Sequence, residues 1–202
     1  MHYIFKYFPN IDDGKIEKFS MLAELYPYWN EKINLISRKD IDNLYQHHVL
    51  HSLALCYFEK FSDSVQVLDV GTGGGFPGIP LAIMFPETSF VLYDGRSKKI
   101  KAVNDIVSKL EIKNVEAQSV RIEDIDKQFN VIIGRAVTSV DVFLTLVSKN
   151  LKKNGIVYYW TGQPMKVKGW SNTIFKIDEA YEEEFYKNKF IEKFIRKINK
   201  MM

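Results

Sequence analysis

The sequence predicts an α/β fold, in which a mostly parallel central sheet carries helices on both faces and follows an N-terminal helical extension. Three observations support this prediction. Short apolar segments alternate with helical patterns from about residue 65 to about residue 160. The first sixty residues show helical periodicity. A glycine cluster follows the first apolar segment, at the place where parallel sheets bind ligands.

The composition is that of a globular protein. Of the 202 residues, 46% are hydrophobic and 26% are charged, which excludes a disordered or collagen-like chain. The single cysteine, Cys56, excludes an internal disulfide framework. Because no long apolar run and no secretory signal occur, we expect a cytoplasmic protein without a membrane span. We also expect a monomer that forms one compact unit, with residues 1–62 as the extension and 63–202 as a Rossmann-like domain.

The extension should contain two helices. In the first, apolar side chains recur at three- and four-residue steps, and Pro27 should break or kink the helix. These apolar side chains are Phe19, Leu22, Leu25 and Trp29. The second helix should begin after Asp40, which could be its N-cap. Its pattern consists of Ile41, Leu44, Tyr45, His48, Leu55 and Phe58.

Five strands should follow the extension, each a short apolar segment. They are expected at residues 65–70, 89–94, 114–117, 129–134 and 155–160. Helices are expected between them at 78–85, 97–110, 121–126 and 139–149. A sixth strand could lie at 172–178. In 189–198 the apolar residues fit a helical period, and a final edge strand is the competing interpretation.

The segment after the first strand carries the sharpest local signal. Its glycines are Gly71, Gly73, Gly74, Gly75 and Gly78. Glycines let the backbone turn tightly and approach a ligand, and three of these match the dinucleotide fingerprint. Asp69, however, stands at the strand end, where a carboxylate disfavours a pyrophosphate. S-adenosylmethionine carries an ammonium and a sulfonium group and no phosphate, so it suits this loop better. Alternatively, Asp69 binds nearby loop amides.

Asp94 ends the second predicted strand. An acid at this position can accept hydrogen bonds from both ribose hydroxyls of a nucleoside ligand. This holds for NAD and for S-adenosylmethionine, so Asp94 supports a nucleoside without choosing between them. The alternative is a cap for the helix that begins near Ser97.

Basic residues gather in three places, although the net charge is only +3. The clusters are Arg96, Lys98, Lys99 and Lys101; Lys149, Lys152 and Lys153; and the lysines and arginine of residues 187–202. They form a phosphate-binding surface if they converge on one rim, and ordinary solvated surface otherwise.

Three histidines, His47, His48 and His51, lie close together in the second helix. No matching cysteine, histidine or acid follows at the spacing of metal ligands. We therefore expect no metal site, and we place these histidines on the surface or at an interface.

Several motifs resemble one family, the bacterial 16S ribosomal RNA guanine-N7 methyltransferases, once called glucose-inhibited division protein B. The resemblance extends from about Phe19 to about Gln163. Its motifs are Trp29–Ser37, His47–Leu53, the extended glycine loop Asp69–Pro80, and Gly134-Arg135-Ala136 where the family has Ser-Arg-Ala.

This resemblance implies a class I S-adenosylmethionine-dependent methyltransferase fold and a substrate in 16S rRNA or the small ribosomal subunit. It places Gly71 and Phe76 against the cofactor, Ile122 and Glu123 beside the adenine, and Arg135 near both cofactor and target base. The full set of expected cofactor contacts is Asp69, Gly71, Gly73, Gly75, Phe76, Asp94, Ile122, Glu123 and Arg135. The expected RNA contacts are Arg96, Lys98, Lys99 and Lys101.

Guanine N7 has an in-plane lone pair and no proton to lose, so no general base is expected and Arg135 is assigned a positioning role. The chain departs from the family at Gly95–Ser97, at His51, where the family has an acid, and at Thr161, where the family has a lysine that bears on RNA affinity. Three other classes stay open: a methyltransferase of small molecules or proteins, a non-catalytic nucleotide-binding module, and an NAD oxidoreductase.

Overall fold

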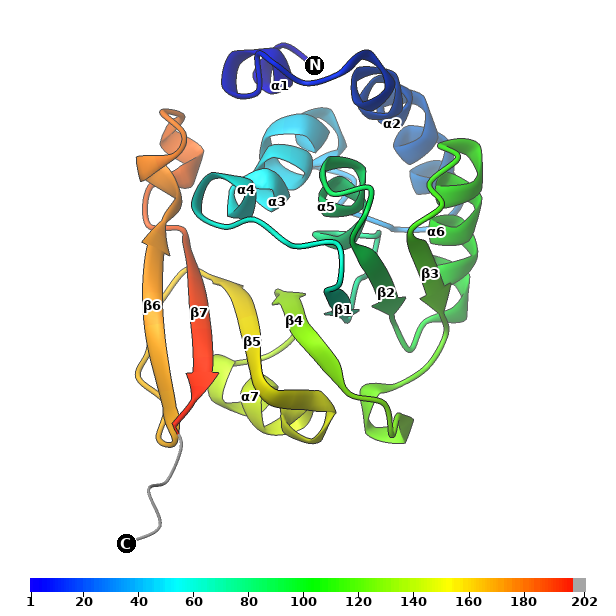
Figure 1. Ribbon diagram of the computed structural model, residues 1–202. Helices are drawn as coiled ribbons and strands as arrows, with labels where there is room; N and C mark the ends of the chain where they lie inside the picture. The colour runs from blue at the N-terminus through cyan, green and yellow to red at the C-terminus, as the bar shows by residue number, and fades with distance from the viewer. Residues whose placement is uncertain (198–202) are drawn as a thin grey trace, which may run out of the picture.

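A seven-stranded sheet forms the centre of the computed structural model, which describes residues 1–197 (Figure 1). The strand order is β3-β2-β1-β4-β5-β7-β6. The strands are β1 (Gln66–Val70), β2 (Ser89–Tyr93), β3 (Val115–Gln118), β4 (Phe129–Arg135), β5 (Leu151–Thr161), β6 (Trp170–Lys176) and β7 (Phe190–Arg196). The first five strands pair in parallel, and β7 is antiparallel to both β5 and β6.

Helices cover both faces of this sheet, as the sequence predicts. The α-helices are α1 (His2–Tyr7), α2 (Asp13–Lys32), α3 (His51–Leu53), α4 (Leu55–Phe58), α5 (Gly78–Met84), α6 (Ser97–Lys109) and α7 (Val140–Val147). Successive side chains of a strand point to opposite faces, so Val67 belongs to the core on the side of α2, α3, α5 and α6, whereas Leu68 belongs to the core on the side of α7. Figure 1 shows α7 alone on its side. No helix of residues 1–197 is both long and apolar enough to cross a bilayer.

The break predicted at Pro27 is not present, because α2 runs unbroken from Asp13 to Lys32. Asp12 caps its start by accepting a hydrogen bond from the Lys15 N–H (3.0 Å). The buried face of α2 includes Leu22, Leu25 and Tyr26. Packing of this face outweighs the backbone hydrogen bond that the proline removes.

The second predicted helix is a succession of short helical types. It comprises the 3₁₀ turn η1 (Ile41–Asn43), the π-helix η2 (Leu44–Leu50), α3 and α4. Asp40 precedes η1 at the predicted cap position, but its side chain makes no capping hydrogen bond. It binds His47 and His48 one to two turns further on. π-helical segments often occur at functional sites, and this one faces the sheet beside β4.

The helical interpretation of residues 189–198 is wrong, since Phe190–Arg196 forms β7. The strand is also not at the edge, because it lies between β5 and β6. A central strand is buried on both faces, so Ile191 and Phe194 are apolar on opposite sides and imitate a helical period. Ile198 of the predicted pattern lies outside the described residues. The sixth strand is confirmed as β6, and it is the edge strand at this end of the sheet, with β3 at the other.

The remaining short turns are all 3₁₀. They are η3 (Ile122–Asp124), where a short helix near 121–126 is predicted, η4 (Ser148–Asn150), η5 (Ile177–Glu179) and η6 (Glu184–Tyr186). The last two carry the chain from β6 back to the start of β7, beside the N-terminal extension. There the Tyr186 hydroxyl donates a hydrogen bond to the Gln46 carbonyl.

Candidate functional site

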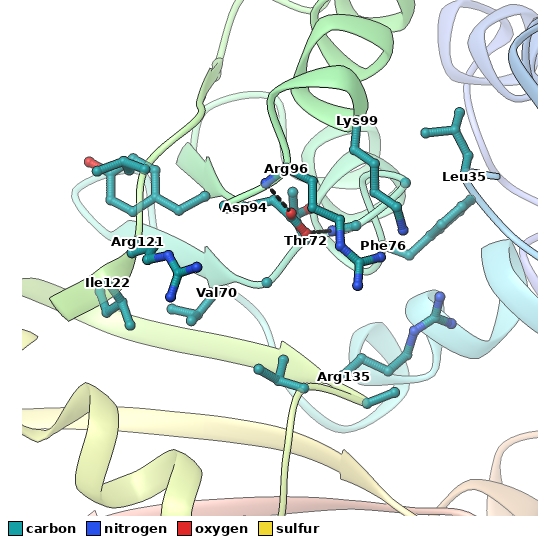
Figure 2. A pocket seen from close by; sticks show the side chains of 18 of the residues that line it. Leu35, Val70, Thr72, Phe76, Asp94, Arg96, Lys99, Arg121, Ile122 and Arg135 are labelled. Carbon is teal, nitrogen blue, oxygen red and sulfur yellow. Dashed lines mark hydrogen bonds between the residues drawn. The ribbon is translucent and has the colours of Figure 1, made fainter. Parts of the chain in front are cut away.

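A cavity of about 560 Å³ opens at the carboxyl ends of β1, β2, β3 and β4 (Figure 2). Its walls are the glycine loop after β1, the residues that end or follow the other three strands, and Leu35, Ile36 and His48 from the N-terminal extension. Lys99 of α6 and Leu146 of α7 complete the lining. Parallel sheets place ligands at this edge, and the volume is in the range of small-molecule sites.

The glycine loop can approach a ligand because it lacks side chains. Gly71, Gly73 and Gly75 have φ angles of 69°, 58° and 89°, a region that other residues rarely occupy. A Cβ atom on Gly71 would lie 2.9 Å from the Val137 side chain. Gly71 and Gly73 line the cavity, whereas Gly75 lies behind the loop. The loop therefore requires glycine for both its conformation and its packing.

Asp69 is fully buried beneath this loop and does not line the cavity. Its Oδ2 accepts hydrogen bonds from the Thr72 hydroxyl (2.6 Å) and the Gly78 N–H (2.9 Å). Its Oδ1 has no partner among residues 1–197. Burial raises the pKa of Asp69 to about 7. Asp69 thus joins the glycine loop to the start of α5, which matches the alternative that its carboxylate binds nearby amides.

Asp94 lines the cavity at the end of β2. Its Oδ2 accepts from the Gly73 N–H (2.9 Å) and its Oδ1 from the Arg96 N–H (2.8 Å), as Figure 2 shows. The N-cap position of α6 is occupied by Arg96, so Asp94 is not the helix cap. Each carboxylate oxygen keeps a lone pair that can accept a hydroxyl. Lys99 lies in the same wall, and burial lowers its pKa.

The lining fits S-adenosylmethionine. Val120 and Ile122 supply apolar surface suited to a purine, and Glu123 lies beside them. Asp94 offers a carboxylate suited to a ribose diol. At its glycines the loop supplies backbone close to the ligand, and within residues 1–197 the carboxylates that line the wall are those of Asp94 and Glu123.

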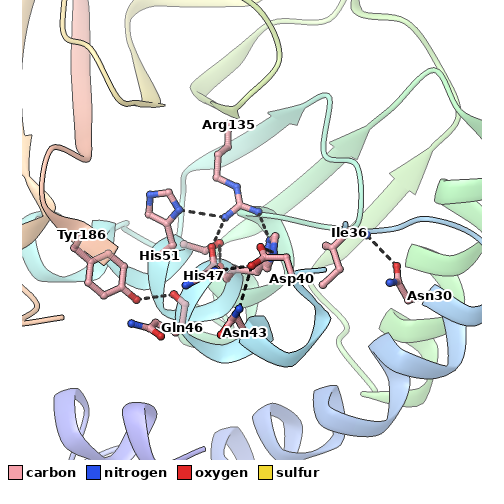
Figure 3. Close-up of polar contacts among 11 residues, drawn as sticks. Asn30, Ile36, Asp40, Asn43, Gln46, His47, His51, Arg135 and Tyr186 are labelled. Carbon is pink, nitrogen blue, oxygen red and sulfur yellow. Dashed lines mark hydrogen bonds and ion pairs between the residues drawn. The ribbon is translucent and has the colours of Figure 1, made fainter. Parts of the chain in front are cut away.

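Arg135 ends β4 and lies in the wall of this cavity together with Phe76, whose ring centroid is 5.3 Å from the guanidinium carbon. The guanidinium faces the extension, as Figure 3 shows. Its Nη2 lies 3.2 Å from His48 Nδ1, and its Nη1 lies 3.5 Å from His51 Nδ1 and 3.4 Å from the His47 carbonyl oxygen. Burial lowers the pKa of Arg135 to about 10. The three histidines therefore lie at an interface, between the extension and β4.

A second cavity, of about 360 Å³, adjoins the first at the carboxyl ends of β4 and β5. Arg135 and Ala136 line both cavities. The other walls of the second cavity combine aromatic and polar residues. Among them are His51, Thr138, Trp160, Thr161, Asn188 and Lys189.

The three basic clusters do not converge. Arg96 and Lys99 line the first cavity, and Lys98 and Lys101 are exposed nearby on α6. Residues 149–153 lie at the amino end of β5, which is the opposite edge of the sheet. Because β7 is antiparallel, residues 187–189 lie at the site edge and Arg196 lies at the other. Lys200 lies outside the described residues.

Sequence reasoning did not identify several wall residues as site residues. These are Leu35, Ile36, His48, Val70, Thr72, Gly74, Tyr93, Gly95, Val120, Arg121, Ala136, Val137 and Leu146. Leu35 and Ile36 belong to the Trp29–Ser37 motif, which was the available signal. Val120 and Arg121 directly precede Ile122, and Val137 follows the predicted fourth strand.

No group of three or more histidine, cysteine or acidic residues suited to a metal ion occurs within residues 1–197.

Comparison with solved structures agrees on the fold. A mutant of MtNAS in complex with S-adenosylmethionine superposes with a TM-score of 0.61, at 11% identity, over 90% of this chain and 76% of that one. A SAM-dependent methyltransferase from Aquifex aeolicus superposes with a TM-score of 0.56, at 15% identity, over 81% of this chain and all of that one. These two likenesses show that the chain has a Rossmann-like α/β fold.

Comparison with known sequences gives the family. A family model described as rRNA small subunit methyltransferase G matches residues 15–198. Ribosomal RNA small subunit methyltransferase G of Flavobacterium johnsoniae is 48% identical, over 94% of this chain and 95% of that protein. The protein of the same name from Bacteroides thetaiotaomicron is 40% identical, over 94% and 97%. The chain belongs to the rRNA small subunit methyltransferase G family.

Proposed function

We propose that this protein transfers a methyl group from S-adenosylmethionine to N7 of a guanine in the 16S rRNA of the small ribosomal subunit. The coarser part of this assignment, an S-adenosylmethionine-dependent rRNA methyltransferase, follows from family membership. The observation that carries the finer part is the shared wall between the two cavities. Arg135 and Ala136 separate a cavity suited to the cofactor from one suited to a base.

Under this proposal the first cavity holds the cofactor. Asp94 accepts the ribose hydroxyls, Ile122 and Glu123 flank the adenine, and the backbone at Gly71 and Gly73 lies against the ligand. Phe76 contributes apolar surface to the same wall. Asp69 and Gly75 do not line the cavity. Asp69 stabilises the loop through its hydrogen bonds to Thr72 and Gly78, and Gly75 allows the positive φ that the loop needs. S-adenosylmethionine, when bound, supplies the methyl group on a sulfonium.

The second cavity holds the target base. Trp160 offers an aromatic surface, and Arg135 offers N–H donors to a guanine carbonyl oxygen or a phosphate. Since N7 carries a lone pair and no proton, no side chain has to remove one. The residues of the shared wall therefore contribute alignment, by holding N7 in line with the methyl group. Product formation places positive charge on the base, so Arg135 is assigned to O6 or phosphate rather than to N7.

Basic residues near the two cavities suit an RNA ligand. Arg96 and Lys99 lie in the wall of the first cavity, and Lys98 and Lys101 are exposed beside it. Lys189 lines the second cavity, close to Thr161, where the resembling family has a lysine. A target guanine in a loop suits this arrangement, because an A-form helix hides N7 in its deep major groove.

The remaining proposals concern assembly. Extension and sheet share one continuous core, and the Tyr26 hydroxyl donates to the Gly74 carbonyl oxygen (2.7 Å). This core supports the proposal that the extension and the Rossmann-like domain form one compact unit. We also propose that the protein acts as a monomer, on small ribosomal subunits in the cytoplasm.

The test is methyl transfer from labelled S-adenosylmethionine to unmodified small ribosomal subunits and to free 16S rRNA, followed by nucleoside analysis. The expected product is labelled 7-methylguanosine, and its yield should fall when Arg135 is replaced by alanine. Labelling of a different nucleoside would contradict the N7 assignment. If no label enters RNA and the cofactor still binds, the rRNA assignment is wrong. The protein would then be a methyltransferase of small molecules or proteins, or a non-catalytic nucleotide-binding module.

A further inference from the structure

Arg135 is a half-buried cation that lines both cavities. Within residues 1–197 no carboxylate oxygen lies within 4.0 Å of its guanidinium. A charge that is partly removed from water is costly unless a partner compensates it. The side chain nevertheless forms the wall between the two cavities, where its orientation determines what each cavity can bind.

The compensating charge reaches Arg135 through an imidazole. Asp40 Oδ2 lies 2.6 Å from His48 Nε2, and His48 Nδ1 lies 3.2 Å from Arg135 Nη2. Arginine only donates hydrogen bonds, so Nδ1 of His48 must carry a lone pair. The ring proton is then on Nε2, from which it is donated to Asp40. These contacts define one tautomer and one charge state, a neutral His48 between an aspartate and an arginine.

The surroundings of His48 agree with this neutral state. Within residues 1–197 the charged and titratable groups that act on it are Asp40, His47, His51 and Arg135. Burial and the Arg135 charge lower the pKa of His48 to about 4, although Asp40 acts in the opposite direction. At neutral pH the imidazole therefore keeps its lone pair for Arg135.

We propose that Asp40 is a positioning residue for methyl transfer, which acts through neutral His48 to hold the Arg135 guanidinium in the wall between the two cavities. The proposal rests on the proposed function, because it assigns Arg135 the task of aligning the acceptor. His51 Nδ1 and the His47 carbonyl oxygen accept from Nη1, so both terminal nitrogens are held. Three acceptors leave two of the five guanidinium N–H groups for a ligand.

The kinetic test compares Asp40→Asn with Asp42→Asn. Asp42 is exposed in the neighbouring turn, so its substitution makes the same chemical change outside the network. Asp40→Asn should lower kcat about tenfold, because a misaligned acceptor reacts slowly. Asp40→Asn removes the charge that compensates Arg135, so it should lower the thermal midpoint. Measured well below that midpoint, the Kd for S-adenosylmethionine should change little, and Asp42→Asn should resemble the unsubstituted protein. Equal kcat values for the two variants would overturn the proposal, as would a loss of cofactor binding in Asp40→Asn as large as its loss of kcat.

His48 offers a rescue test. The glutamine in His48→Gln has an acceptor and a donor spaced much like the two ring nitrogens, so it can connect Arg135 to Asp40. The leucine in His48→Leu has neither. We expect His48→Gln to recover part of the kcat that His48→Leu loses. Equal losses would contradict an action of Asp40 through the ring.

Nitrogen NMR of histidine-labelled protein tests the network without any activity. At pH 7 the His48 ring should be neutral with its proton on Nε2, and Asp40→Asn should perturb the Nε2 resonance. A charged ring, or a proton on Nδ1, would overturn the proposal whatever the kinetics. If the unsubstituted protein methylates no RNA, the proposed function fails, and the tautomer measurement still decides whether the network exists.

Discussion

Gly134 lies against the Phe143 ring of α7, directly before Arg135. A Cβ atom on Gly134 would be 2.4 Å from Phe143 Cζ. The family has serine at this position. In this chain the Phe143 ring fills the space that the serine side chain would need. Gly134→Ser should therefore lower the free energy of unfolding by about 1–3 kcal/mol, the usual cost of overpacking. Urea denaturation measures this change.

A double-mutant cycle separates this clash from other effects of the serine. The smaller side chain in Phe143→Leu removes the ring atoms that the new Cβ meets. In that background Gly134→Ser should cost less than it does alone. An equal cost in both backgrounds would show that the ring is not the cause.

The raised pKa of Asp69 makes the stability of the protein depend on pH. Its folded-state pKa, about 7, lies above the ordinary value of 3.8, so the folded protein binds a proton that the unfolded chain does not bind at pH 6. The stability contribution of this group is present at low pH and is lost as the pH rises through 7. Asp69→Asn carries no such charge. Between pH 6 and pH 8 its unfolding free energy should therefore improve by about 1 kcal/mol relative to the unsubstituted protein. A pH-independent difference in urea titrations would contradict the raised pKa.

Among the elements, the parallel strands and the helices between them could be predicted because each is set by local pattern. β7 could not, because a strand buried on both faces repeats apolar residues as a helix does. The continuity of α2 through Pro27 depends on packing against distant segments, which periodicity does not contain. Asp40 looked like a cap because its spacing to the next helix is that of a cap. Its actual partners depend on the π-helix that follows.

Trp29 connects two elements that are far apart in the chain. Its Nε1–H donates to Asp105 Oδ2 (2.7 Å), which joins α2 to α6. Trp29→Phe keeps an aromatic ring and removes this donor, so it should lower the free energy of unfolding by about 1–2 kcal/mol. Tyr28→Phe, on the exposed side of the same helix, should change it by less than about 0.5 kcal/mol. Similar effects of the two variants in chemical denaturation would show that the hydrogen bond does not stabilise the protein.

The position of the cavity at the sheet edge could be predicted from the sequence, because the strand ends and the glycine loop identify it. The far wall of the cavity could not be predicted. Leu35, Ile36 and His48 come from the extension, and they reach the cavity only because α2 and η2 pack over that edge. The second cavity depends likewise on residues 188–189, which return to the site edge because β7 is antiparallel. These are consequences of topology, which no local pattern contains.

The same topology makes a prediction about RNA binding. Lys98 and Lys101 lie at the site edge of the sheet, whereas Lys152 and Lys153 lie at the opposite edge with the same charge and similar exposure. Each phosphate contact adds about 0.7–0.9 to the slope of log affinity against log salt concentration. Replacing Lys98 and Lys101 together by alanine should therefore reduce that slope by about 1–2 for 16S rRNA or small subunits.

The matched control is replacement of Lys152 and Lys153 by alanine, which lowers the net charge equally. If RNA contacts only the site edge, this variant keeps the original slope, because long-range attraction between exposed charges is screened at about 10 Å in 0.1 M salt. A filter-binding series over salt concentration measures both variants. Equal reductions in slope would mean that the protein attracts RNA through its net charge. In that case Lys98 and Lys101 would not form a specific RNA-binding surface.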